Sequence, residues 1–70
     1  MTINEKIHMT RIKKGMSLAE LAFKTEYAIK DIIRYETNGT IINGHALLKI
    51  IKAFNMSIVE FQNITIETLI

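Results

Sequence analysis

The sequence contains no cysteine, and this absence excludes several kinds of chemistry at once. Disulfides, thiolate zinc sites and thiol nucleophiles all require cysteine. The two histidines, His8 and His45, lie far apart in the sequence, and neither has a second ligand three or four residues further on. We therefore expect no metal site and no cofactor.

Proline is also absent, and there is no Ser/Gly-rich stretch that would indicate a linker, a low-complexity segment or an internal repeat. No apolar run approaches the roughly 18 residues that a membrane span needs, and the first residues lack the basic-then-apolar layout of a signal peptide. We expect one small domain in the cytoplasm, without a membrane partner.

Aspartate is scarce as well, because Asp31 is the only one in the chain. Ser17 and Ser57 both have structural explanations as helix caps, so no serine–histidine–acid set can be assembled. Nothing in the sequence supports catalysis, and we predict that the protein is not an enzyme.

Apolar residues, in contrast, are plentiful at 49% of a chain of 70 residues. A domain of this size buries only about 60% of the surface that its unfolded chain exposes. The surplus of apolar side chains indicates a shared surface, and we expect a homodimer formed through the last helix and the residues after Asn63.

The net charge of +2 is modest and unevenly distributed. Residues 1–40 hold seven Lys/Arg against five Asp/Glu, whereas residues 41–70 hold two against two. The basic excess lies entirely in the first part of the chain, which is weak support for a surface that faces phosphates there.

Apolar spacing and capping patterns predict short helices in close succession. Ile3, Ile7 and Thr10 recur at helical spacing before Gly15, which predicts a first helix over residues 3–14. Ser17 and Glu20 form a capping-box pattern that opens a second helix. This helix should bury the stripe Leu21, Ala22 and Thr25.

A third helix is predicted over residues 28–37, with Ile32 and Tyr35 turned inward, and Asn38-Gly39 breaks the chain after it. Asn43 can cap a fourth helix that Asn55 ends in a left-handed conformation. Its apolar side should hold Leu47, Ile50, Ile51 and Phe54, with Lys49 and Lys52 on the other side.

Ser57 and Glu60 form a second capping-box pattern, and it predicts a fifth helix whose Ile58 and Phe61 close the core. After Asn63 the pattern changes. The tail, residues 64–70, is β-branched and alternates apolar with polar residues over its first four positions, which is typical of a strand. A loosely docked end and a dimer-forming strand both fit this tail.

Taken in register, these segments resemble the XRE family of lambda-repressor/Cro-type helix-turn-helix regulators. The resemblance implies an all-α domain of five helices over residues 1–63, followed by the tail. It rests on residues 3–61, through Arg11, Lys14-Gly15-Met16-Ser17, Glu20-Leu21-Ala22, Ile32, Arg34-Tyr35-Glu36, Leu47-Leu48-Lys49-Ile50, Lys52-Ala53-Phe54 and Met56-Ser57-Ile58.

In that family the second and third helices form the DNA-binding unit, and the third lies in the major groove of double-stranded DNA. The resemblance implies that Arg11 pairs with Glu36 as a structural ion pair. It also places the DNA-facing residues on this chain: Lys14, Ser17, Leu18, Ala28, Ile29, Lys30, Asp31, Ile33, Arg34, Thr40 and Asn43. Among them, Thr40 and Asn43 stand where the loop before the fourth helix meets the DNA backbone.

Three positions depart from the family pattern. Leu18 replaces a glutamine that contacts a phosphate, and Ala28 replaces a hydroxyl residue that starts the recognition helix. Glu26 replaces the glycine of the turn, where a left-handed conformation costs a non-glycine residue roughly 1 kcal/mol. Leu18, Ile29 and Ile33 are expected to project toward one outer face, which can touch thymine methyls or form a protein interface.

Two functions from different classes follow. The first is a sequence-specific DNA-binding transcription regulator, a repressor that reads the major groove with residues 28–37. The second is a helix-turn-helix protein that binds another protein through Leu18, Ile29 and Ile33, as an antirepressor or an inhibitor of another regulator. An antitoxin that represses its own operon would combine both activities.

Overall fold

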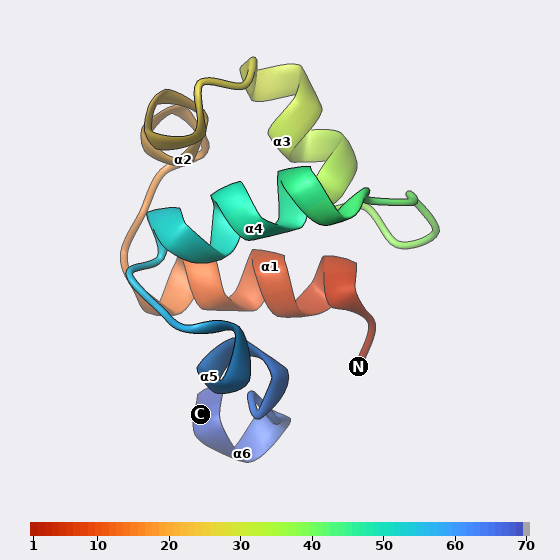
Figure 1. Cartoon of the computed structure of the whole chain (residues 1–70), viewed down its shortest axis with the longest axis vertical. Coiled ribbons are helices and arrows are strands. Elements are labelled where there is room, and N and C mark those ends of the chain that lie inside the picture. Colours follow the sequence, from red (N-terminus) through yellow and green to blue (C-terminus); the bar gives the residue numbers. More distant parts are fainter. Residues whose placement is uncertain (70) are drawn as a thin grey trace.

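The computed structural model describes residues 1–69, and within them the chain forms six helices and no strand. α2 and α3 lie at one end of the molecule, and α5 and α6 lie at the opposite end, with α1 and α4 between them (Figure 1). The helices are α1 (Ile3–Lys13), α2 (Leu18–Thr25), α3 (Ile29–Tyr35), α4 (Gly44–Ala53), α5 (Ile58–Gln62) and α6 (Ile66–Leu69).

Side-chain caps begin the helices where the sequence predicts them. The Ser17 hydroxyl accepts from the backbone N–H of Glu20 at 3.0 Å, and the Asn43 side-chain oxygen accepts from Ala46 at 2.8 Å. Ser57 forms a complete capping box, because its own N–H also donates to the Glu60 carboxylate at 2.9 Å. Each cap satisfies backbone donors that the first helical turn leaves free.

The helices end as the turn residues indicate. Gly15 and Asn55 adopt left-handed backbone conformations, with φ of +69° and +59°. Glycine and asparagine tolerate this region best, because other side chains clash with the following carbonyl. These two residues therefore set the exits of α1 and α4.

The core contains side chains from five of the helices and from the tail. Its fully buried side chains include Ile7, Leu21, Ile32, Ile50 and Phe54. Phe61 of α5 is also buried and covers the end of the core nearest α5. One sequence prediction is wrong here, because Ile58 is 49% exposed and does not help to close the core. With only one turn and a half in α5, the helix can turn a single aromatic side chain inward, and Phe61 takes that position.

The strand predicted for the tail is absent from the described residues, and Ile70 lies outside them. Residues 66–69 form α6, whose start is held by the Thr68 hydroxyl: it accepts from Thr65 N–H at 2.8 Å and donates to Thr65 O at 2.7 Å. Ile64 is buried in the core, and Leu69 packs against it. The β-branched alternation was overridden by local hydroxyl bonding and by the burial of Ile64.

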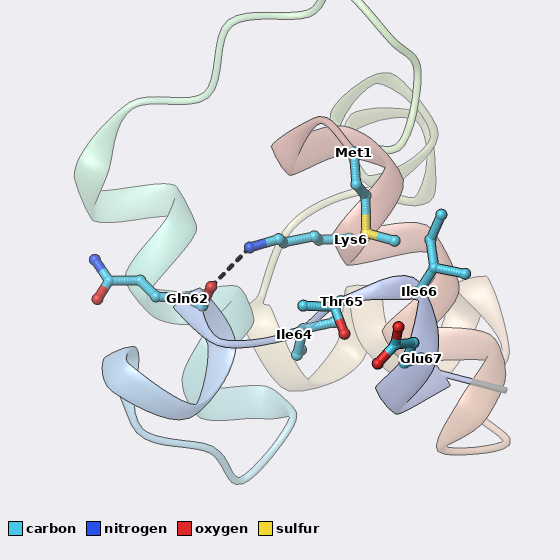
Figure 2. Close-up of a pocket in the computed structure, with 7 residues that line it drawn as sticks. All are labelled: Met1, Lys6, Gln62, Ile64, Thr65, Ile66 and Glu67. Atoms are coloured by element: carbon cyan, nitrogen blue, oxygen red, sulfur yellow. Dashed lines mark hydrogen bonds between the residues drawn. The ribbon is translucent and has the colours of Figure 1, made fainter.

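Lys6 of α1 contacts the last residue of α5. The Lys6 ammonium donates to the backbone carbonyl of Gln62 at 2.9 Å, next to a cavity of about 530 Å³ that the tail borders (Figure 2). The same ammonium stands 5.9 Å from the ring centre of Phe61. Both contacts place the positive charge on groups that attract it, a carbonyl dipole and an aromatic face.

Arg11 and Glu36, which the resemblance pairs, lie in contact between α1 and the end of α3. Their side chains are 8% and 6% exposed, and Arg11 Nε donates to Glu36 Oε2 at 2.6 Å. A second guanidinium nitrogen donates to Oε1 at 3.1 Å, and the third donates to the carbonyl of Met16 at 2.8 Å. The side chain of His8 is 51% exposed, and its Nδ1 lies 2.6 Å from Glu36 Oε1.

We predict that this ion pair tolerates joint replacement better than the loss of one partner. Glu36→Leu should lower the free energy of unfolding by about 3–5 kcal/mol, because it leaves the Arg11 charge buried without a counter-charge. The double variant Arg11→Met/Glu36→Leu should recover much of that loss. Urea unfolding followed by circular dichroism measures both, and equal losses in the single and double variants would contradict the prediction.

Candidate nucleic-acid interface

A tight turn joins α2 to α3 and sets the angle between them. Glu26 holds a left-handed conformation with φ of +63°, and Tyr27 N–H donates to Ala22 O at 3.1 Å. These features close the end of α2 in the way that a glycine usually does. Ala28 starts α3 without a side-chain cap, as its methyl group requires. No side-chain hydrogen bond therefore caps the start of α3.

Aromatic packing supports the turn from beneath. Tyr27 and Tyr35 meet edge to face, with ring centres 5.7 Å apart and planes at 70°. Lys49 was expected on the outer side of its helix, but its ammonium donates to Thr25 O at 3.4 Å and lies 5.1 Å from the Tyr27 ring centre. It stands at the C-terminus of α2, where free carbonyls attract a cation.

Asn4 of α1 bonds to the last residue of α3 and to the loop that follows it. Asn4 is buried, and its amide nitrogen donates to Tyr35 O at 2.8 Å and to Thr40 O at 3.0 Å. The sequence analysis did not include this residue. Its signal was the spacing of Asn4, Ile7 and Arg11 along one face of a helix, which places a polar group on the buried side.

Four side chains of α3 face outward together. Ile29 and Ile33 are 46% and 48% exposed and stand one turn apart, and Lys30 and Arg34 are exposed on the same short helix. Ile32, fully buried, fixes the opposite side of α3 in the core. The helix therefore presents an outer surface that is part cationic and part apolar.

Asp31 and Arg34 form an ion pair on the surface of α3. Arg34 Nη1 donates to Asp31 Oδ1 at 3.3 Å, and the Asp31 side chain is only 28% exposed. The Arg34 guanidinium also lies 5.7 Å from the Tyr35 ring centre. An exposed pair of this kind contributes little to stability, so Arg34 remains available to a stronger anionic partner.

Leu18 is less exposed than the apolar residues Ile29 and Ile33 of α3. It is half-buried and packs against the hydrophobic core. As the first residue of α2, it lies where the missing glutamine would have been, and its apolar side chain gains more from the core than from water. The outward apolar pair is therefore reduced to Ile29 and Ile33.

The remaining predicted site residues divide into two groups. Ser17 and Asn43 use their side-chain oxygens to cap α2 and α4, and Thr40 is half-buried in the loop after α3. Lys14 lies beside a cavity that Glu60 of α5 also lines. α5 lies at the opposite end of the molecule from α3 (Figure 1).

The family model for helix-turn-helix domains of the XRE/Cro type matches residues 7–61. The chain belongs to this family. Comparisons with curated proteins and with solved structures return no match. Membership of this family implies DNA binding, and it is typical of regulators that are not enzymes. α2, the turn and α3 correspond to the helix-turn-helix motif, whose second helix enters the major groove in proteins of this kind.

Two other properties of this helix-turn-helix domain follow from the described residues. No helix within residues 1–69 combines the length and hydrophobicity that a membrane crossing requires. The histidines and carboxylates in the same range do not gather into any group of three that would hold a metal ion.

We predict that the turn of the helix-turn-helix domain stores strain at Glu26. Glu26→Gly should raise the free energy of unfolding by up to about 1 kcal/mol, because glycine enters the left-handed region without a Cβ clash. Lys24→Gly in the body of α2 should instead lower it by about 1 kcal/mol. Thermal unfolding compares the two variants, and a loss of stability in Glu26→Gly would contradict the assignment of strain.

Proposed function

We propose that the protein is a sequence-specific transcription regulator that acts as a repressor and reads the major groove with α3. The observation that supports this proposal is the outer surface of α3, where Ile29, Lys30, Ile33 and Arg34 are all exposed. Repression needs no contact beyond occupancy of the DNA site, so a domain of this size suffices for it.

Each outward side chain suits a different part of the double helix. Lys30 can donate to the acceptors of guanine, and the methyl groups of Ile29 and Ile33 match the thymine methyl in the same groove. Arg34, near the end of α3, is suited to a phosphate, for which it would exchange its exposed bond to Asp31. We assign base contact to Ile29, Lys30 and Ile33 and phosphate contact to Arg34.

The reduced apolar pair favours DNA over a protein partner at this surface. A protein-binding patch needs desolvated anchors that a partner can enclose. Ile29 and Ile33 are each flanked by a cation of the same helix, and Leu18 is drawn toward the core. Two half-exposed isoleucines between cations do not form such a patch, and they are compatible with a helix that lies in the major groove.

A homodimer on a two-part site is the second element of the proposal. α5 presents Ile58 and Val59, which are 49% and 62% exposed, next to the tail that contains the exposed Ile66. Their exposure is costly in a single domain and is relieved when a second copy covers them. Two copies of α3, one helical turn of DNA apart, would then read the two half-sites.

We predict that the cations of α3 carry DNA affinity. Lys30→Ala and Arg34→Ala should each weaken binding to the operator, and the loss of a phosphate contact should reduce the slope of log affinity against log salt by about one unit. Lys52→Ala removes the same charge from an exposed position of α4, outside the helix-turn-helix unit, and serves as the control. Fluorescence anisotropy with DNA flanking the gene, at two salt concentrations, measures all three.

Substitutions of Ile29 and Ile33 test the alternative, in which this surface binds a protein. In a DNA reader, Ile29→Ala should weaken binding only at a site with a thymine opposite it, whereas an exposed apolar control, Phe23→Ala, should have no site-dependent effect. The proposal fails if no DNA fragment is bound more tightly than random DNA while a protein partner is lost on Ile33→Ala.

We predict that a charge on α5 separates the two copies. Val59→Asp should leave the fold intact, because Val59 is exposed, but should shift the protein to monomer and weaken binding to a two-part site more than to a half-site. Sedimentation velocity measures the assembly, and the control is Ile41→Asp, which places the same charge at an exposed apolar position in the loop before α4. A wild-type protein that sediments as a monomer at high concentration would contradict the prediction.

A further inference from the structure

One buried hydroxyl in α1 has no hydrogen-bond partner. Thr10 is only 3% exposed, and its Oγ1 is the one buried side-chain polar atom within residues 1–69 that bonds to nothing. A helical threonine usually donates to the carbonyl four residues earlier, as Thr25 does to Leu21 O at 2.8 Å. A buried hydroxyl that lacks such a bond is destabilising unless some other group satisfies it.

Thr10 lines a cavity of about 440 Å³ between α1, α5 and α6. This volume lies within the range of small-molecule sites, roughly 300–1,000 Å³. One part of the wall is apolar, formed by Met56, Ile64 and Leu69. The polar part consists of Thr10, Lys13, Lys14, Glu60, Asn63 and Thr68. The cavity thus combines an apolar wall with a cluster of polar groups.

The charges around this cavity favour an anion. Lys13 and Lys14 are both exposed, and neither forms an ion pair within residues 1–69. The Ser57 backbone N–H and hydroxyl lower the pKa of the Glu60 carboxyl group, and the charge of nearby Lys14 lowers it further. Two lysines against one glutamate leave a formal charge of +1 on the lining residues.

We propose that this cavity is a binding site for a small carboxylate that carries a short alkyl chain. The carboxylate lies between Lys13 and Lys14 and accepts from the Thr10 hydroxyl, which turns toward it. The chain packs against Met56, Ile64 and Leu69. The ligand would satisfy the hydroxyl, balance the charge and cover the apolar wall at once.

The two neighbouring cavities lack this combination. The larger one, about 530 Å³, contains the Lys6 ammonium, but Lys6 already donates to Gln62 O (Figure 2). The smaller one, about 330 Å³, is lined by His8, Met9, Ile12, Lys13 and Leu69. Neither is lined by a buried hydroxyl without a partner. Of the three cavities, the one at Thr10 is therefore the best candidate for a ligand site.

Octanoate is the probe for this site, with acetate and 1-octanol as controls. Titrated into the ¹⁵N-labelled protein, octanoate should produce saturable amide shifts concentrated at Thr10, Lys14 and Asn63. Acetate at the same concentration has the charge without the chain, and it should leave the amides of Met56 and Ile64 in place. 1-Octanol has the chain without the charge and should bind more weakly than octanoate.

Thr10→Val separates ligand binding from a structural role of the hydroxyl. The valine variant should unfold at the same or a higher temperature than the wild type, because the unpartnered hydroxyl is gone. Its affinity for octanoate should nevertheless fall about tenfold or more, the loss expected for a hydrogen bond to a charged group. A variant that only disturbed packing would lose stability as well as affinity.

The lysines supply a second readout. Lys13→Gln/Lys14→Gln should weaken octanoate binding and leave 1-octanol binding unchanged, whereas Lys24→Gln on α2 should alter neither. Unchanged octanoate affinity in Thr10→Val would overturn the proposal, since the hydroxyl would then be satisfied by water alone. Equal shifts with acetate, or shifts at the same amides that depend on protein concentration without ligand, would also overturn it, the latter in favour of a second copy.

Discussion

The arrangement of the recognition helix depends on two polar contacts that α1 makes with the end of α3. Asn4 binds the carbonyls of Tyr35 and Thr40, and Arg11 binds the carboxylate of Glu36 with two nitrogens. Both contacts are buried, so their geometry is precise and a missing partner is costly. Because they hold the last turn of α3 and the loop after it, α3 meets the core at one angle, and the outward direction of its side chains follows from that angle.

The end of the molecule proposed to face DNA is thus tied to α1 by buried polar contacts, and its turn contains unusual residues for this family. The turn before α3 keeps the geometry of its family although Glu26 occupies the left-handed position. Backbone bonds and the contact between Tyr27 and Tyr35 supply what a glycine and a capping hydroxyl would have supplied. The strain at Glu26 is tolerated because the packing on both sides of the turn determines its conformation.

The opposite end of the molecule is packed less completely. Ile64 and Leu69 of the tail pack on the core, but cavities remain on the sides of this tail, and Thr10, whose buried hydroxyl has no partner, lines one of them. A short helix that covers a small core can bury few side chains, so space and a polar atom are left over. The physical contrast between the two ends separates a surface for DNA from a proposed site for a small ligand.

The sequence by itself determined the positions of the first five helices, because helix caps and left-handed residues at helix ends are local features. Ser17, Asn43, Ser57, Gly15 and Asn55 act within a few residues of themselves, and each lies where its pattern indicated. The family register likewise placed α3 and the contact of Arg11 with Glu36. Only the tertiary structure decided the contacts that the local sequence pattern did not predict. Leu18 packs toward the core, Asn4 bridges two distant carbonyls, and the tail forms a helix, because the burial of a side chain depends on residues far away in the sequence.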